Sequence, residues 1–269
     1  MNTPAPSHTG AIEFVVNEGI ATLALNRPDK RNAINDAMRT ELMAALDEVA
    51  RNPQIKALVL TGNGKAFCAG GDIASMQQRM QAPAGEIAFN GWSRQQRTHH
   101  AVAMLHALPK PTIAAVNGAS TGLGADLALC CDFIIASEAA SFAWTYILRG
   151  LIPDGGGMYF LPRRVGLSKA KDLIFSGRKL DAAQALELGI ADRVSSPNTL
   201  LDDARAWAAE LGHGSTAALA LAKSVMNKTF ELSAEEVFAQ GSQAQAICYT
   251  TAEHHASVNA FLAKTAGKA

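Results

Sequence analysis

The chain has 269 residues, of which 48% are hydrophobic, so it can bury a large core in one large domain or two small ones. Lysine plus arginine (24) equals aspartate plus glutamate (24), which gives no bulk attraction to nucleic acid or to an anionic membrane. The N-terminus lacks a signal pattern, and no apolar run reaches the ~20 residues of a membrane span. We therefore expect a cytoplasmic protein that binds neither nucleic acid nor membrane.

The first hundred residues alternate between strand and helix patterns. Two apolar runs at 12–17 and 20–26 flank Glu18-Gly19 and predict a β-hairpin. Asp36 is predicted to be the N-cap of an amphipathic helix that Pro53 ends. A strand at 57–61 and a glycine-containing loop at 65–73 follow. Helical patterns then cover 74–81 and 86–108.

The stretch from Lys110 to Asp132 predicts a buried strand at 112–116, a glycine-bearing turn and a helix. The first N–H groups of a helix have no internal partner and carry partial positive charge, so such a helix start can stabilise an oxyanion. A glycine-rich packing turn that feeds a buried helix explains the same pattern without any chemistry. The stretch by itself leaves both interpretations open.

The remainder of the chain changes from α/β alternation to helices alone. Short strands are predicted at 133–136 and 141–144, followed by a second glycine-dense turn at 150–157. Helical patterns cover 168–175, 181–188, 200–211, 216–230 and 234–262. We predict an α/β core at 1–197 and a helical C-terminal region at 198–269, which packs on the core or on a partner subunit.

Several kinds of site are not supported by the sequence. Cys68, Cys130, Cys131 and Cys248 lack metal-ligand spacing and are expected to be reduced thiols. The histidines at 99, 100 and 106 are expected to be solvated or core residues, so no metal is predicted. There is no phosphate-binding loop motif, and Ser120 lacks a recognisable triad.

Three loops in order resemble signature segments of the crotonase, or enoyl-CoA hydratase/isomerase, family. The stretch KAFCAGGDI, beginning at Lys65, is similar to the family's AFxAGxDI loop. LPKPTIAAVNGASTGLGADLALCCD resembles KPxIAAVxGxAxGGGxELALxCD, and GLIPDGGGMYFLPRRVG resembles GLxPGxGGTxxLPRxVG. One glycine loop is weak evidence, but three with matching spacing are specific, and the resemblance covers about 12–262.

The resemblance implies a spiral of ββα units that binds an acyl-CoA thioester in fatty acid metabolism. The helical C-terminal region would assemble homotrimers or dimers of trimers, and no cofactor is implied beyond the coenzyme A of the substrate. Carried over by position, the backbone N–H groups of Gly71 and Leu123 would hold the thioester oxygen. Leu123 replaces a usual glycine; it still donates its N–H, but its side chain would narrow the pocket.

The resemblance also implies further substrate contacts. The coenzyme A adenine would lie against Ala66, Phe67, Cys68 and Ala69, with Asp72 and Ile73 completing that loop. Arg27 and Lys30 would contact phosphates at the mouth of the site, although a solvated turn explains these two cations equally well.

The chain departs from the pattern of the family's hydratases, which hold a water between two glutamates. Asp126 stands at the first position, and its role is open between catalytic assistance and a structural buried hydrogen bond. Tyr146 stands at the second, and a phenol with a pKa near 10 is a poor base at neutral pH. Tyr146 and Trp144 are expected to be pocket walls.

Asp154 stands where those hydratases carry a glycine, which resembles the family's phenylacetate-pathway epoxide/enoyl-CoA isomerase branch. Isomerisation needs one base that takes a proton at one carbon and returns it at another, and Asp154 suits this role. The alternative is that Asp154 only caps the following helix. We expect an enoyl-CoA isomerase. The rivals are a hydratase that uses Asp126 and Asp154, and a non-catalytic acyl-CoA-binding protein.

Overall fold

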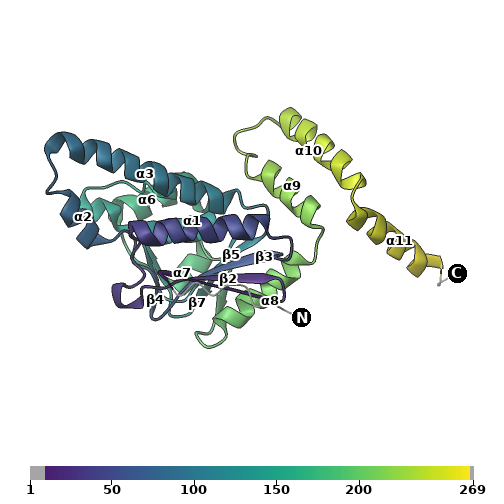
Figure 1. Cartoon of the computed structure of the whole chain (residues 1–269), viewed down its shortest axis with the longest axis horizontal. Helices are drawn as coiled ribbons and strands as arrows, with labels where there is room; N and C mark the ends of the chain where they lie inside the picture. The colour runs from purple at the N-terminus through teal and green to yellow at the C-terminus, as the bar shows by residue number, and fades with distance from the viewer. Residues whose placement is uncertain (1–9, 267–269) are drawn as a thin grey trace.

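The computed structural model describes residues 10–266, as two sheets enclosed by helices and a helical arm (Figure 1). The larger sheet has the order β1-β2-β3-β5-β7-β10. Its strands are β1 (Ile12–Asn17), β2 (Ile20–Leu25), β3 (Ala57–Gly62), β5 (Thr112–Val116), β7 (Phe133–Ser137) and β10 (Arg193–Ser195). The smaller sheet has the order β4-β6-β8-β9, with β4 (Ala66–Cys68), β6 (Ala119–Thr121), β8 (Ser141–Ala143) and β9 (Leu180–Asp181).

The predicted hairpin is confirmed at the edge of the larger sheet. β1 pairs with β2 antiparallel, with Ile12 opposite Leu25, and Glu18-Gly19 makes the turn with both residues at positive φ. The other pairs of this sheet are parallel. β2, β3 and β5 are buried along their whole length, as expected for parallel strands that helices cover on both faces.

Helix α1 (Asp36–Arg51) packs on the larger sheet and buries four apolar side chains in the core, Met38, Leu42, Leu46 and Val49. The prediction that Asp36 caps this helix was wrong: Asn35 is the N-cap, and its side chain accepts the Met38 N–H at 2.9 Å. Asp36 is the first helical residue and pairs with Arg39 instead.

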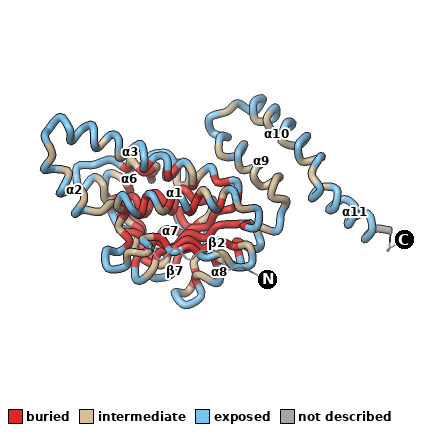
Figure 2. The backbone as a smooth tube through the Cα atoms, viewed as in Figure 1, coloured by how far each residue is buried: buried red, intermediate tan, exposed pale blue. Residues whose placement is uncertain are grey.

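A second apolar cluster covers the sheet through α8 (Leu200–Gly212). Its Leu200, Ala204, Trp207 and Ala208 are buried against residues of β3, β5 and β7. Figure 2 shows the buried backbone concentrated in the sheet and the helices that touch it. Helix α8 lies beyond position 197, so the first helix of the predicted C-terminal region packs on the core.

The remaining core helices are α2 (Ile73–Arg79), α3 (Ala84–His106), α4 (Leu123–Cys130), α5 (Gly157–Val165), α6 (Leu167–Ser176) and α7 (Ala182–Glu187). Two short 3-10 helices, η1 (Pro28–Lys30) and η2 (Thr145–Arg149), complete it. The smaller sheet was missed from the sequence except for β8, because its strands are two or three residues long and lie within glycine-bearing turns.

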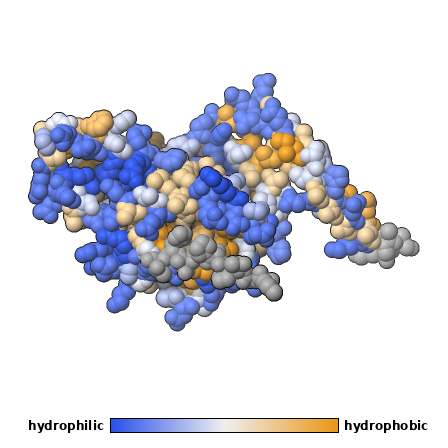
Figure 3. Space-filling model, in the orientation of Figure 1, coloured by the Kyte–Doolittle hydropathy of each residue, from blue (hydrophilic) through white to orange (hydrophobic). Residues whose placement is uncertain are grey.

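Three helices, α9 (Thr216–Met226), α10 (Ala234–Tyr249) and α11 (Ala252–Ala266), leave the core as an arm (Figure 1). The prediction of a single helix at 234–262 was wrong, because α10 ends at Tyr249 and a separate helix, α11, begins at Ala252. The hydroxyls of Thr250 and Thr251 bond to carbonyls of the preceding turn, which competes with helix continuation. Figure 3 shows apolar surface along the arm, where Met226, Phe230, Phe238 and Ile247 are exposed. No helix within residues 10–266 is both long and apolar enough to cross a membrane.

Candidate active site

Two glycine-bearing segments from different strands meet at the start of α4. β4 pairs with β6 in the smaller sheet, which brings the loop after Cys68 beside the turn before Leu123. A Cβ at Gly124 would lie 2.3 Å from the Cys68 carbonyl oxygen, so only glycine allows this approach. A Cβ at Gly70, whose φ is +95°, would lie 3.5 Å from the Leu123 nitrogen.

The amides of Gly71 and Leu123 are both without a protein acceptor within the described part of the chain. Gly71 pairs with Ile34, but this pairing uses the N–H of Asp72 and the carbonyl of Gly70. Leu123 is the first residue of α4, where N–H groups have no intrahelical partner. The predicted helix start is therefore confirmed, and two adjacent segments each offer a free donor.

Asp126 lies one turn into α4 and is fully buried. Its Oδ1 accepts the indole N–H of Trp144 at 3.0 Å, and its Oδ2 accepts the Tyr146 hydroxyl at 2.7 Å. Burial raises its pKa to about 7, against the opposing effect of these donors and of the Gly157 N–H. Both carboxylate oxygens are thus held by protein donors.

Trp144 and Tyr146 reach Asp126 from the end of β8 and from η2. Trp144 is fully buried and its indole N–H is bonded to Asp126, and its place as a pocket wall stays a prediction. Burial and the neighbouring Asp126 raise the pKa of Tyr146, which keeps its hydroxyl protonated and donating. The resemblance puts Asp126 and Tyr146 at the two positions that hold one water in the family's hydratases, so their proximity could be expected, whereas the sequence carried no signal for the Trp144 hydrogen bond.

Asp154 lies in the loop that packs on Leu123 and Asp126 through Gly155. A Cβ at Gly155 would lie 2.3 Å from Leu123 Cδ1 and 2.7 Å from Asp126 Oδ2, so the residue after Asp154 touches both. No other described residue donates a side-chain hydrogen bond to the Asp154 carboxylate. Burial raises its pKa, although Arg94 and His99 oppose the rise.

The alternative that Asp154 caps the next helix was wrong. The N-cap of α5 is Gly156, at φ 109°, and no side chain caps that helix. Asp154 stands two residues earlier, which leaves its carboxylate unused by helix α5.

The segment at 65–73 buries three consecutive side chains and exposes others. Ala66, Phe67 and Cys68 are buried, so a ligand there would meet their backbone, whereas Ala69 and Ile73 are exposed. Burial raises the pKa of Cys68 to about 12, which keeps this thiol protonated and unreactive. All four cysteines are free, in agreement with the sequence.

Asp72 and Arg27 pair with each other. Asp72 caps α2 by accepting the Ser75 N–H and also accepts from Arg27 at 2.9 Å. Arg27 further donates to the Ala33 carbonyl, so its guanidinium is engaged inside the protein. Lys30 is exposed at the end of η1. The phosphate contacts of Arg27 and Lys30 stay predictions, and the ion pair makes Lys30 the freer of the two.

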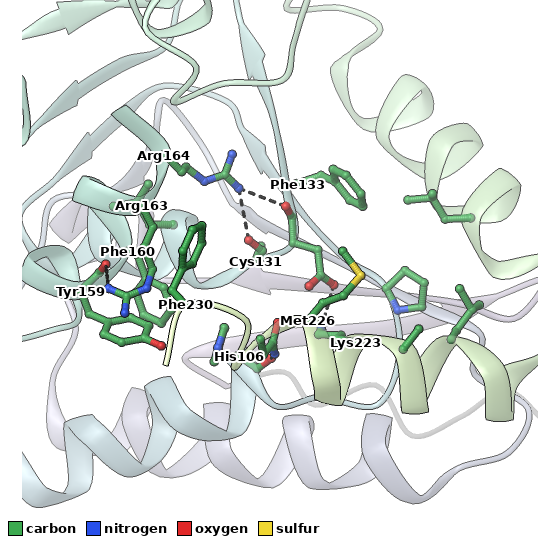
Figure 4. Close-up of a pocket in the computed structure, with 17 residues that line it drawn as sticks. His106, Cys131, Phe133, Tyr159, Phe160, Arg163, Arg164, Lys223, Met226 and Phe230 are labelled. Atoms are coloured by element: carbon green, nitrogen blue, oxygen red, sulfur yellow. Dashed lines mark hydrogen bonds and ion pairs between the residues drawn. The ribbon is translucent and has the colours of Figure 1, made fainter. Parts of the chain in front are cut away.

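An apolar cavity of about 490 Å³ lies elsewhere, between the core and α9 (Figure 4). Phe133, Tyr159, Phe160, Met226 and Phe230 line it, with charged groups on its wall. None of the predicted site residues line this cavity, so it is separate from the candidate active site.

Among the described residues no group of His, Cys, Asp and Glu side chains could hold a metal ion, and His99 and His100 are exposed. The Ser120 hydroxyl is buried without a partner in the part of the chain that the structure describes, which does not support a triad.

The chain is similar to known proteins over most of its length. A family model described as enoyl-CoA hydratase/isomerase matches residues 15–268. The chain is 38% identical over 256 residues to 1,2-epoxyphenylacetyl-CoA isomerase of Escherichia coli, covering 94% of this chain and 97% of the relative. It is also 38% identical to a probable enoyl-CoA hydratase of Rhizobium meliloti, covering 91% and 92%.

Solved structures show the same fold. The enoyl-CoA hydratase/isomerase from Cupriavidus metallidurans superposes with a TM-score of 0.87 at 33% identity, over 94% of each chain. An enoyl-CoA hydratase from Polaromonas gives a TM-score of 0.87 at 31% identity, over 95% of this chain and 98% of that one. The predicted α/β fold of the crotonase type is confirmed.

Proposed function

The chain belongs to the enoyl-CoA hydratase/isomerase family of enzymes, and from this we propose that it is an acyl-CoA isomerase. It shifts a double bond from the 3-enoyl to the 2-enoyl position, or rearranges a related ring-containing acyl-CoA. One observation carries the proposal. Asp126 accepts from a protein donor at each carboxylate oxygen, whereas no other residue of the described chain donates a hydrogen bond to the Asp154 carboxylate.

The unoccupied carboxylate suits proton transfer. In its ionised form Asp154 takes a proton from C2 of a 3-enoyl-CoA, and the electron pair moves toward the thioester oxygen to form a dienolate. Protonated Asp154 then returns the proton to C4, and the electrons move back to leave the double bond between C2 and C3. No other group is consumed, and a carboxyl pKa raised by burial lies nearer neutral pH, which helps both steps.

The free N–H groups of Gly71 and Leu123 are our candidates for holding the dienolate oxygen. They sit in adjacent segments, they are backbone groups held by a sheet and a helix, and they need no reorganisation to donate. Loss of one such donor in comparable sites costs about 3 kcal/mol of transition-state stabilisation.

A hydratase is the second candidate, because the Rhizobium relative is named a probable enoyl-CoA hydratase and the Polaromonas neighbour an enoyl-CoA hydratase. Two aspartates would have to position the water. A water on Asp126 would have to reach a remaining lone pair of a fully buried carboxylate whose two oxygens already accept from Trp144 and Tyr146, which disfavours this alternative. The E. coli relative, named as an isomerase, supports the first candidate.

The deciding experiment is a panel of 2-enoyl-CoA and 3-enoyl-CoA substrates of several chain lengths, assayed in parallel for hydration and for migration of the double bond. We expect migration with every reactive substrate and little hydration. Hydration without migration would contradict the isomerase assignment. Tight binding of acyl-CoA with no reaction of any kind would favour a non-catalytic protein.

Three finer features belong to the same proposal. The enzyme uses no cofactor beyond the coenzyme A of its substrate, it works in the cytoplasm, and it is a homotrimer or a dimer of trimers. The exposed apolar side chains of the α9–α10 arm support self-association. Sedimentation velocity measures the mass: a monomer at micromolar concentration would contradict the assembly.

A further inference from the structure

Helix α3 contacts the peptide that carries Asp154. The Nε2 atom of His99 lies 2.9 Å from the Asp154 carbonyl oxygen. A carbonyl only accepts, so Nε2 bears the hydrogen in this bond. The Asp154 N–H donates to the Ile152 carbonyl at 2.8 Å, so both sides of this residue's backbone are tied.

We propose that His99 of α3 is a positioning residue for Asp154, because it fixes the backbone of the loop through the Asp154 carbonyl. This rests on the proposed role of Asp154 as the proton-transfer base. It predicts that α3, which lies outside the three glycine-bearing segments, affects the rate of the reaction.

The role of His99 is tested with His99→Leu, His99→Gln and the matched control His100→Leu. The His100 side chain is exposed at the neighbouring position and makes no hydrogen bond to another residue of the described chain. Glutamine can donate from its own amide nitrogen, and leucine cannot. We expect His99→Leu to lower kcat about fivefold with KM unchanged, as for loss of one hydrogen bond. His99→Gln should recover most of the rate, and His100→Leu should match the wild type.

A second measurement on the same variants does not require turnover. Amide hydrogen exchange of residues 151–157 should quicken in His99→Leu and stay at the wild-type rate in His99→Gln and His100→Leu, at equal thermal stability. Unchanged exchange in His99→Leu would overturn the positioning role, as would an equal effect of His100→Leu.

The two proposals fail in distinguishable ways. If wild-type enzyme does not isomerise, the proposed function is wrong, and if Asp154→Asn keeps its rate, Asp154 is not the base; in both cases hydrogen exchange still decides whether His99 holds the loop. If Asp154→Asn is inactive but His99→Leu behaves as wild type in every measurement, the function stands and the inference about His99 is overturned.

Discussion

Two aspartates beside Leu123 have the same side chain and opposite surroundings. Asp126, on α4, is fully buried and accepts from Trp144 and Tyr146. Asp154, on the loop before α5, is partly exposed, and its carboxylate has no partner among the other described side chains. Burial raises the pKa of both. A raised pKa therefore does not separate a structural carboxylate from a chemical one, whereas the occupancy of its oxygens does.

The largest effect should come from Asp154→Asn, which keeps the shape of the loop and removes the titrating group. Isomerisation should fall at least about 10²-fold, the usual contribution of a positioned acid–base group. Binding of a saturated acyl-CoA, measured by calorimetry, should stay within about twofold. A near-wild-type rate would show that Asp154 does not transfer the proton.

Replacing Asp126 with asparagine should instead act on stability. One of the two donors, Trp144 or Tyr146, would face an amide NH₂ and lose its acceptor inside the core, at a cost of about 1–3 kcal/mol of unfolding free energy. Urea denaturation measures it. An unchanged unfolding midpoint together with lost activity would reverse the roles that we assign to the two aspartates.

The same residue gives a pH dependence. Because the folded pKa of Asp126 lies near 7, above its ordinary value of 3.8, the folded state binds the extra proton between these limits. The contribution of Asp126 to stability is therefore full below about pH 4 and is lost as the pH rises through 7, by at most about 1.4 kcal/mol per pH unit. Subtracting the stability profile of Asp126→Asn from that of the wild type should show this fall, and a rise would contradict it.

An intermediate effect is expected at the contact between the two regions. In Gly155→Ala the new Cβ would meet Leu123 Cδ1 and Asp126 Oδ2, so the Asp154 loop must move away from α4. We expect kcat to fall about tenfold, since small misplacements of a base are costly. Gly91→Ala is the control, because a Cβ there meets nothing within 4 Å. Equal rates for both variants would show that the contact does not position Asp154.

The smallest effect should come from Tyr146→Phe, which removes one donor to Asp126 and leaves the ring. Unfolding free energy should fall by about 1 kcal/mol at neutral pH, and less at pH 5, where Asp126 is protonated. The isomerisation rate should change little. A large loss of kcat with full stability would give Tyr146 a chemical role.

Much of this arrangement could be predicted from residue patterns. The hairpin turn, the buried strands and the start of α4 at Leu123 follow from apolar runs and glycine positions, which are local properties. The cap of α1 was misplaced by one residue, because Asn35 and Asp36 are both good N-caps and the pattern does not choose between them. The interruption between α10 and α11 was missed because threonine also occurs inside helices. Here the hydroxyls of Thr250 and Thr251 bond to carbonyls of the preceding turn, and residue type alone does not predict these bonds.

The sequence by itself determined the family, the α/β fold, the two glycine segments that offer amides, and the presence of Asp126 and Asp154. Only the tertiary structure decided how these two carboxylates differ. Trp144 and Tyr146 reach Asp126, and His99 reaches the Asp154 carbonyl, from elements distant in the chain. Hydrogen bonds and burial depend on which atoms come into contact in the folded protein. The order of residue types along the chain does not by itself specify contacts between distant elements.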